Sequence, residues 1–284
     1  MLGRSFNVAG TKISIVTMPT VLTAMQGWIS NRSGRYIVCP DVHQVIRARK
    51  DRALHASLEA ADCVTPDGMP LVWTARLLGY KNVSRVCGPD LLPEAVKHGI
   101  DFGWRHYFYG GSPEVVEKLV RELERKFPGV IIAGSYSPPF RAQTPEEVES
   151  DCARIRASKA DLVWVGLGCP KQEWWMASNA RQCGGAVLVG IGAAFNFHAG
   201  TVARAPVWMR ERGLEWAFRI SQEPKRLLRR YLATAPQFIA LAVATIMREK
   251  LAHFGLAEAE TIGLIPETTG ASASYEPAQD EASD

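Results

Sequence analysis

Six short apolar segments alternate with helical segments through the first two thirds of this 284-residue chain. They span residues 34–40, 61–68, 106–111, 130–135, 161–168 and 186–191. Most are continuous apolar runs, which is typical of parallel strands buried on both faces of a sheet. Strands separated by helices in this way predict an α/β fold, a Rossmann-like parallel sheet with helices on both faces. Ligands of such sheets bind at the carboxyl ends of the strands.

The alternation stops near residue 203, and the chain becomes helical in pattern, rich in Arg and Trp, and interrupted by three prolines. We therefore predict a Rossmann-like core over 1–202 and a basic, aromatic, membrane-associating C-terminal helical appendage over 203–256. The last residues, 257–284, are acidic and have too little apolar surface to bury, so they are expected to be disordered.

The charge of the chain is unevenly distributed. The net charge is +4, but the acidic tail has seven acids and no Lys or Arg, which leaves +11 on the rest. Such a body favours anionic partners such as nucleotides or phospholipid headgroups. The six cysteines are scattered without metal-site spacing, which favours reduced thiols and the cytosolic side. No signal peptide is recognised, and no apolar run approaches the roughly 20 residues of a bilayer span.

A carboxylate follows the second apolar segment, in Thr65-Pro66-Asp67-Gly68. Pro-Asp-Gly is ideal turn chemistry, and the turn is the simpler interpretation. The functional interpretation is that the strand end holds Asp67 in the cleft as a general base for a sugar hydroxyl.

Glycine-rich turns follow two other segments and can admit an anion close to the backbone. Gly110 and Gly111 precede a helix with a good N-cap, although an ordinary strand-to-helix turn has the same pattern. Gly190 and Gly192 begin like a dinucleotide fingerprint, but Phe195 stands where the third glycine belongs, so the fingerprint fails.

A third strand end opens into Lys171, Gln172 and Glu173, which could hold a base, ribose or phosphate. An exposed first helical turn would accept the same residues equally well. No Asp-x-Asp pair occurs, which weighs against a divalent metal on a donor diphosphate. We therefore expect no metal and no cofactor, with arginines neutralising the phosphates.

Arg219, Arg226 and Arg229 are candidates for that role. Arg226 and Arg229 share a face of a helix that Pro224 is expected to start, and Arg219 lies on the element before it. A solvated basic face is the ordinary alternative. Aromatic residues among the arginines, and the apolar run 238–247 after them, favour a peripheral membrane-binding element.

The chain resembles the WecG/TagA/CpsF glycosyltransferases, glycosyltransferase family 26. The resemblance covers roughly residues 6–232 in unbroken order. The matching stretches are Thr65-Pro-Asp-Gly-Met-Pro-Leu-Val, Tyr109-Gly-Gly-Ser-Pro-Glu, Ser137-Pro-Pro-Phe, Asp161-Leu-Val-Trp-Val-Gly-Leu-Gly-Cys-Pro-Lys-Gln-Glu, Gly190-Ile-Gly-Ala-Ala-Phe-Asn-Phe-His-Ala-Gly, Arg204-Ala-Pro and Gly213-Leu-Glu-Trp-Ala-Phe-Arg-Ile-Ser-Gln-Glu-Pro-Lys-Arg.

The resemblance implies an inverting, metal-independent transfer of a sugar from a UDP-sugar to a polyprenyl-diphosphate-linked acceptor, at the cytoplasmic face of the cell membrane. It implies that Asp67 is the catalytic base and that the three arginines close over the donor diphosphate. We expect the product to be an exopolysaccharide or another cell-surface polysaccharide, and we expect no nucleic-acid partner. A homo-oligomer is left open. The residues predicted to bind substrate are Thr65, Cys39, Asp41, Gly110, Gly111, Lys171, Gln172, Glu173, Gly190, Gly192, Asn196, Arg219, Arg226 and Arg229.

Two departures from the family pattern leave the donor sugar open among glucose, N-acetylmannosamine and its uronic acid. Cys39-Pro40-Asp41 stands where the family usually has Thr-x-Asn, and Asn196 stands where it usually has Asp. A thiol is a weaker hydrogen-bond donor than a hydroxyl, and Asp41 adds negative charge near a diphosphate.

Two other classes of function stay open on the residues alone. A nucleotide-dependent oxidoreductase could use the same type of sheet, although the broken glycine fingerprint opposes it. A non-catalytic membrane or nucleic-acid binding module could use the basic helices, but then the Pro-Asp-Gly cleft would have no purpose.

Overall fold

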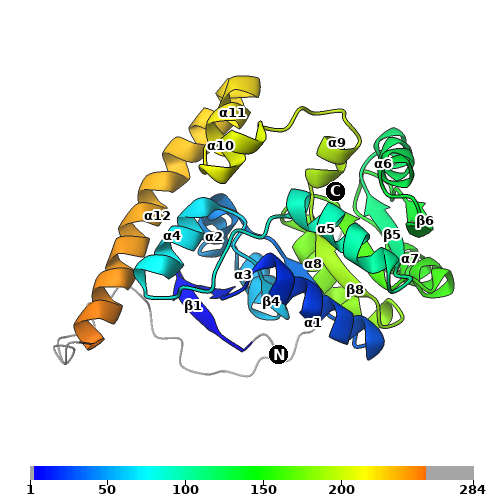
Figure 1. Cartoon of the computed structure of the whole chain (residues 1–284), viewed down its shortest axis with the longest axis horizontal. Coiled ribbons are helices and arrows are strands. Elements are labelled where there is room, and N and C mark those ends of the chain that lie inside the picture. The colour runs from blue at the N-terminus through cyan, green and yellow to red at the C-terminus, as the bar shows by residue number, and fades with distance from the viewer. Residues whose placement is uncertain (1–2, 254–284) are drawn as a thin grey trace, which may run out of the picture.

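The structure, a computed structural model, describes residues 3–253. A two-stranded antiparallel hairpin precedes a parallel sheet of six strands (Figure 1). The strands are β1 (Ser5–Val8), β2 (Thr11–Ser14), β3 (Tyr36–Val38), β4 (Cys63–Val64), β5 (Arg105–Gly110), β6 (Ile131–Tyr136), β7 (Leu162–Gly166) and β8 (Val187–Gly190).

The six parallel strands lie in the order β4-β3-β8-β7-β5-β6. Each corresponds to one of the six apolar segments, so the predicted Rossmann-like sheet is confirmed. Successive residues of the central strand β7 are buried on opposite faces, Leu162 and Trp164 on one and Val163 and Val165 on the other. This is why the strand is apolar throughout. The β1–β2 hairpin was not predicted.

Helices cover both faces of the sheet, and each face has its own hydrophobic core. One core gathers side chains from α1, α5, α6 and α9; the other gathers them from α2, α3, α4, α7, α8 and the hairpin. The helices are α1 (Met18–Ser30), α2 (Val42–Ala48), α3 (Arg52–Glu59), α4 (Met69–Leu77), α5 (Gly88–Ile100), α6 (Pro113–Lys126), α7 (Pro145–Ser158), α8 (Lys171–Asn179) and α9 (Ala194–His198), with a short 3-10 helix at Ala180–Gln182.

Three further helices follow the sheet: α10 (Val207–Glu211), α11 (Glu215–Gln222) and α12 (Pro224–His253). We call these three helices the appendage. α12 begins at Pro224, as predicted, and runs along one side of the molecule, with α10 and α11 beside its N-terminal half (Figure 1). Phe238 and Ala242 of α12 are buried in the core that α2 and α4 share. The predicted disordered tail, 257–284, lies outside the described residues.

α12 is longer and more continuous than the apolar run from which it was predicted, because the helix includes Pro236 and continues to both sides of 238–247. Among residues 3–253 it is the one helix that is long and apolar enough to cross a bilayer, judged by length and composition alone. The sequence expectation counted only uninterrupted apolar residues and therefore missed this property.

Candidate active site

A cavity of about 690 Å³ lies at the carboxyl ends of β3, β4 and β8, on the side of the core where the appendage packs. β3 and β8 are neighbours in the sheet, but β3 leads into α2 on one face and β8 leads into α9 on the other. A crevice opens where neighbouring strands diverge in this way, and it is the usual ligand site of an open α/β sheet. The volume is within the ordinary range for small-molecule sites.

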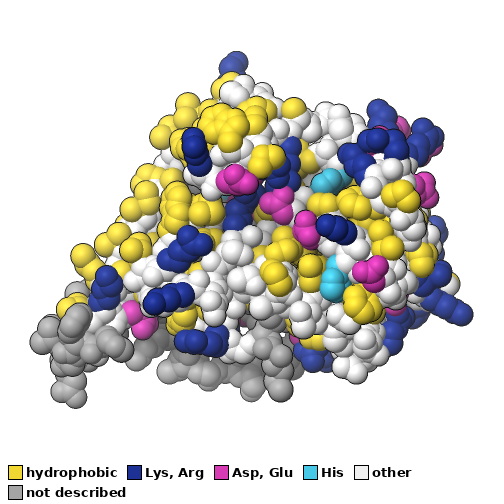
Figure 2. All heavy atoms as spheres, in the orientation of Figure 1, with side chains coloured by type: hydrophobic (Ala, Val, Ile, Leu, Met, Phe, Trp, Pro, Cys, Tyr) yellow, Lys and Arg dark blue, Asp and Glu magenta, His cyan; other side chains and the backbone are white. Residues whose placement is uncertain are grey.

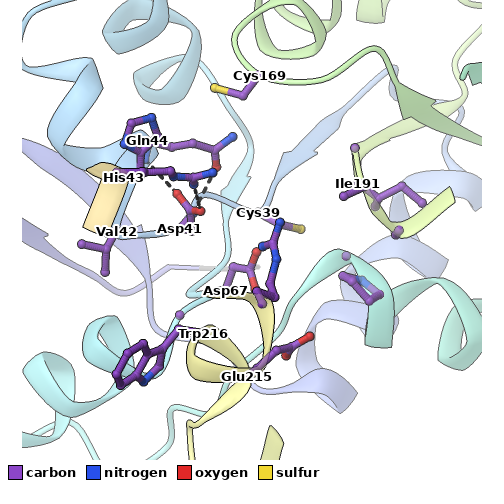
Figure 3. A pocket seen from close by; sticks show the side chains of 18 of the residues that line it. Cys39, Asp41, Val42, His43, Gln44, Asp67, Cys169, Ile191, Glu215 and Trp216 are labelled. Atoms are coloured by element: carbon purple, nitrogen blue, oxygen red, sulfur yellow. Dashed lines mark hydrogen bonds and ion pairs between the residues drawn. The ribbon is translucent and has the colours of Figure 1, made fainter. Parts of the chain in front are cut away.

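Side chains from the core and from the appendage line this cavity together (Figure 3). Cys39 and Asp41 follow β3, and Asp67 follows β4. Glu215 and Trp216 of α11 border the cavity on the side opposite Cys169 (Figure 3). The appendage therefore completes a site that the sheet alone leaves open.

Backbone pairing beyond the end of β4 holds Asp67 in place. The amide of Thr65 donates to the carbonyl of Val38 at 2.9 Å, and its hydroxyl donates to the carbonyl of Val86 at 2.7 Å. The amide of Val86 in turn donates to the carbonyl of Pro66 at 3.1 Å. Thr65 is fully buried and lies outside the cavity lining, so it supports the loop that presents Asp67.

The carboxyl group of Asp67 lies in a recess with 29% of its side chain exposed. Burial raises the pKa of Asp67 from 3.8 to about 7, and the negative charges of Asp41 and Glu215 act in the same direction. Arg85 and Arg219 oppose the shift. A carboxylate whose pKa is near neutrality can take up a proton at the pH of the cell, which is what a general base requires.

Arg85 is the nearest cation to Asp67 and was not predicted from the sequence. Its Nε donates to the Asp67 carbonyl at 2.8 Å and lies 4.0 Å from Asp67 Oδ1. Its Nη2 donates to Glu215 Oε2 at 2.6 Å. Arg204 lies 3.4 Å from the other oxygen of Glu215, and both Arg204 and Arg210 pair with Asp90 at the start of α5. These ion pairs join α10 and α11 to the core.

Asp41 connects the first turn of α2 to α12. Its Oδ1 accepts the amide of Gln44 at 2.9 Å as the N-cap of α2, and its Oδ2 accepts a hydrogen bond from Arg230. The side chain that departs from the family pattern therefore has an ionic partner in this chain. Cys39, the other departure, also lines the cavity, and burial raises the pKa of its thiol.

Two glutamine side chains at the cavity wall share one buried carboxylate. Glu173 Oε1 accepts from Gln172 Nε2 at 2.9 Å and from Gln44 Nε2 at 3.3 Å. The amide oxygens are held as well, because Gln172 Oε1 accepts from the amide of Gly168 and Gln44 Oε1 from the amide of Asp41. Glu173 does not line the cavity, so it orients the two amides that do.

The predicted glycines separate into two groups. Gly190 and Gly192 line the cavity, and a Cβ at Gly190 would lie 2.6 Å from Met176. Gly110 and Gly111 lie outside the lining: a Cβ at Gly110 would lie 2.6 Å from the backbone of Gly166, so its role here is close packing of neighbouring strands.

Arg219 and Arg226 line the cavity, whereas the exposed Arg229 does not. Arg230 takes the position expected of Arg229. Residues three and four apart from Arg226 both lie near its face of the helix, and the packing of α12 decides which of them reaches the cavity.

Two other predicted residues also lie outside the lining. Lys171 is exposed at the start of α8, with its ammonium 5.4 Å from the centre of the Phe140 ring. The side chain and carbonyl oxygens of Asn196 accept hydrogen bonds from the hydroxyl of Thr201. The predicted residues that the structure does bring together at the cavity are Cys39, Asp41, Asp67, Gln172, Gly190, Gly192, Arg219 and Arg226.

The fold and the cavity define an α/β protein with a candidate substrate site at the carboxyl edge of a parallel sheet, beneath a helical appendage. The model of the glycosyl transferase WecG/TagA/CpsF family matches residues 6–252. The chain belongs to this family and is a glycosyltransferase. Membership in this family argues against the two other classes of function that the sequence left open, a nucleotide-dependent oxidoreductase and a non-catalytic binding module.

Two curated relatives have the same name, N-acetylglucosaminyldiphosphoundecaprenol N-acetyl-beta-D-mannosaminyltransferase. The protein from Bacillus spizizenii is 30% identical over 212 residues, which cover 75% of this chain and 80% of the relative. The protein from Bacillus subtilis is 29% identical over 223 residues, covering 78% and 83%.

Proposed function

We propose that this chain is an inverting, metal-independent glycosyltransferase that moves a sugar from a UDP-sugar to a polyprenyl-diphosphate-linked acceptor in the synthesis of an exopolysaccharide or another cell-surface polysaccharide. The observation that supports it best is that Asp67, whose pKa burial raises to about 7, lines the same cavity as the arginines of the appendage. A base and a cationic leaving-group site are the two elements that a single displacement needs.

In the proposed reaction, Asp67 takes the proton of the acceptor hydroxyl while the hydroxyl oxygen bonds to the anomeric carbon. The bond from that carbon to the donor phosphate breaks, and its electron pair leaves with UDP. Attack from the face opposite the leaving group inverts the anomeric configuration. Fixed positive charge aimed at the developing diphosphate lowers the barrier, and this electrostatic contribution is often the largest in catalysis.

Arg219, Arg226 and Arg230 are the residues proposed to bind the diphosphate. All three line the cavity and come from α11 and α12. Their guanidinium groups can bind phosphate oxygens bidentately. They would supply the positive charge that other enzymes obtain from a divalent metal. Gln44 and Gln172, whose amides Glu173 orients, are suited to hydrogen-bond the polar groups of the sugar or the base.

The names of the relatives support an acceptor of the polyprenyl-diphosphate type, since both proteins are named for transfer to N-acetylglucosaminyldiphosphoundecaprenol. They also make UDP-N-acetylmannosamine the first donor to test. The other donors to test are UDP-glucose and the UDP derivative of N-acetylmannosaminuronic acid, because Cys39 and Asp41 line the cavity and differ from the family pattern.

Such an acceptor is anchored in a membrane, and the appendage has a surface suited to contact one. Hydrophobic side chains gather over α10, α11 and α12 (Figure 2). The exposed ones are Val207, Trp208, Trp216, Leu228, Leu232, Ile239, Val243, Met247 and Leu251. We call this set the apolar stripe.

We infer that α12 lies along the cytoplasmic face of the membrane rather than across it. Arg226 and Arg230 in its first turns line the cavity, and Leu227, Phe238 and Ala242 are buried against the rest of the protein. A helix that crossed the bilayer would withdraw these side chains from their partners. An amphipathic helix in the interface keeps them and buries the opposite face in lipid.

A panel of nucleotide sugars tests this function. A ligand that binds the folded protein raises its melting temperature, so UDP and at least one of the three UDP-sugars should do so, whereas NADH should not. The same UDP-sugar should then donate its sugar to a short-chain polyprenyl-diphosphate-N-acetylglucosamine, and NMR of the product should show an inverted anomeric centre. No melting shift with any UDP-sugar, or a product of retained configuration, would overturn the proposal.

A further inference from the structure

Three carboxylates lie within 4.0 Å of the Arg85 guanidinium, those of Asp67, Asp90 and Glu215, and they come from different parts of the fold. Asp67 belongs to the core, at the end of β4, and Glu215 is the first residue of α11 in the appendage. The guanidinium donates to Glu215 Oε2 at 2.6 Å, whereas Asp67 Oδ1 is 4.0 Å away. With side-chain exposures of 15% for Arg85 and 16% for Glu215, this pair is shielded from solvent. The closest ionic partner of Arg85 is therefore the carboxylate of the appendage.

We propose that Glu215 is a positioning residue that couples docking of the appendage to the reactivity of Asp67, through Arg85. The inference rests on the proposed function, in which Asp67 is the base. When the appendage is docked, Glu215 engages the guanidinium at 2.6 Å and leaves Asp67 with only a long contact of 4.0 Å to it. When α11 moves away, Arg85 has only core carboxylates to pair with: Asp67, whose Oδ1 lies 4.0 Å from its Nε, and Asp90, whose Oδ2 lies 3.9 Å from its Nη2. Asp90 is already paired with Arg204, so Asp67 is the carboxylate that gains most from Arg85.

The consequence for the base follows from the sign of each charge. A carboxylate in a close ion pair holds its proton less tightly and is a weaker base. Glu215 has the opposite effect, since its negative charge raises the pKa of Asp67 while Arg85 lowers it. Docking thus makes Asp67 a stronger base at the moment when the appendage arginines reach the cavity. Away from the docked state, Asp67 is a weaker base and the appendage arginines are withdrawn from the cavity, which limits hydrolysis of the donor.

Other charged or titratable groups face Asp67 and stay in place when Glu215 is changed. Asp41 and Arg219 act on its carboxyl from α2 and α11, one raising and one lowering its pKa. Cys39, Cys87 and Tyr231 also lie close enough to feel its charge, and the pKa of each is raised above its usual value, mainly by burial. None of these groups replaces the contact between Glu215 and Arg85.

The test is the pH profile of kcat/KM for Glu215→Gln in the full-length chain, with UDP-sugar and acceptor. We expect the midpoint of the acid limb to move to lower pH by roughly one unit, the size of shift that one nearby charge produces. The plateau rate should fall several-fold, because a base with a lower pKa takes up a proton less readily. Glu215→Asp keeps the charge, so the midpoint of its acid limb should lie close to that of the parent protein. Glu211→Gln removes one charge from the exposed end of α10 and is the matched control.

An unchanged midpoint in Glu215→Gln, whatever happens to the rate, would show that Glu215 only holds the appendage in place. Titration of ¹³C-labelled aspartate by NMR, with the Asp67 signal assigned from Asp67→Asn, gives the same comparison without turnover and also serves for Glu215→Asp if Glu215→Gln does not fold. If the parent protein transfers no sugar, the proposed function fails. If it transfers sugar but the titration of Asp67 does not respond to Glu215, only the coupling fails.

Discussion

Asp41 and Arg230 form an ion pair that joins the end of β3 to α12, although they are 189 residues apart in the chain. Asp41 caps α2 with its other oxygen, so a single carboxylate fixes the start of a core helix and an arginine of the appendage. The pair lies at the wall of the cavity. It therefore holds the appendage at the place where the donor diphosphate is proposed to bind.

Asp41→Asn should isolate this ion pair, because Asn is as good an N-cap as Asp and keeps the cap of α2. With 22% and 31% of the two side chains exposed, we expect a loss of about 0.5–1 kcal/mol in the free energy of unfolding. In a chain that already carries Arg230→Gln, Asp41→Asn should cause no further loss in the free energy of unfolding. Urea unfolding of the parent, the two single variants and the double variant measures the coupling energy between Asp41 and Arg230. Asp51→Asn, at the cap of α3, is the control, and equal coupling to Arg230 from both positions would contradict the assignment.

Asp67→Asn should reduce turnover by a factor on the order of 10² or more, because the acceptor hydroxyl loses its base. Binding of the donor should be nearly unchanged, since the arginines stay in place. Steady-state transfer rates and the melting shift with UDP measure the two effects separately. Asp101→Asn, on the exposed C-cap of α5, should leave both unchanged. A near-normal rate in Asp67→Asn would remove Asp67 from the mechanism.

The raised pKa of Asp67 also predicts how stability depends on pH. Burial moves this pKa from 3.8 to about 7 in the folded protein, so the folded state holds the proton more tightly than the unfolded chain does. The stabilisation that results is complete below pH 4 and is lost as the pH rises to about 7. Asp67→Asn cannot titrate, so its melting temperature relative to the parent should rise between pH 4 and pH 8. A difference that is constant over this range would contradict the shifted pKa.

The apolar stripe makes the membrane proposal testable with single charges. Leu232 and Ile239 of α12 are 67% and 61% exposed, so Glu at either position should cost the folded protein little. Each should weaken binding to anionic phospholipid vesicles by about tenfold or more, since a buried aliphatic side chain contributes roughly 1.5–3 kcal/mol. Gln237→Glu places the same charge at an exposed polar position of the same helix. Sedimentation with vesicles compares the three, and equal binding would argue against the stripe as the contact.

Much of the core was predictable because the signals that specify it are local. The six strands, the start of α12 at Pro224 and the place of Asp67 after β4 all follow from apolar runs and turn residues that are neighbours in the chain. Gly110 shows the limit of such signals. A glycine turn indicates only that a side chain is absent, and the neighbouring strand at Gly166 is what occupies that space.

The sequence by itself determined the α/β core, its carboxyl-edge site and the basic character of the appendage, because hydrophobic periodicity and turn chemistry act over a few residues. Only the tertiary structure decided that Arg230 rather than Arg229 faces the cavity, that Glu215 binds Arg85, and that Glu173 lies behind Gln44 and Gln172. These contacts depend on how α11 and α12 pack against the sheet. A rotation of one residue about a helix axis, about 100°, changes which charge meets which partner.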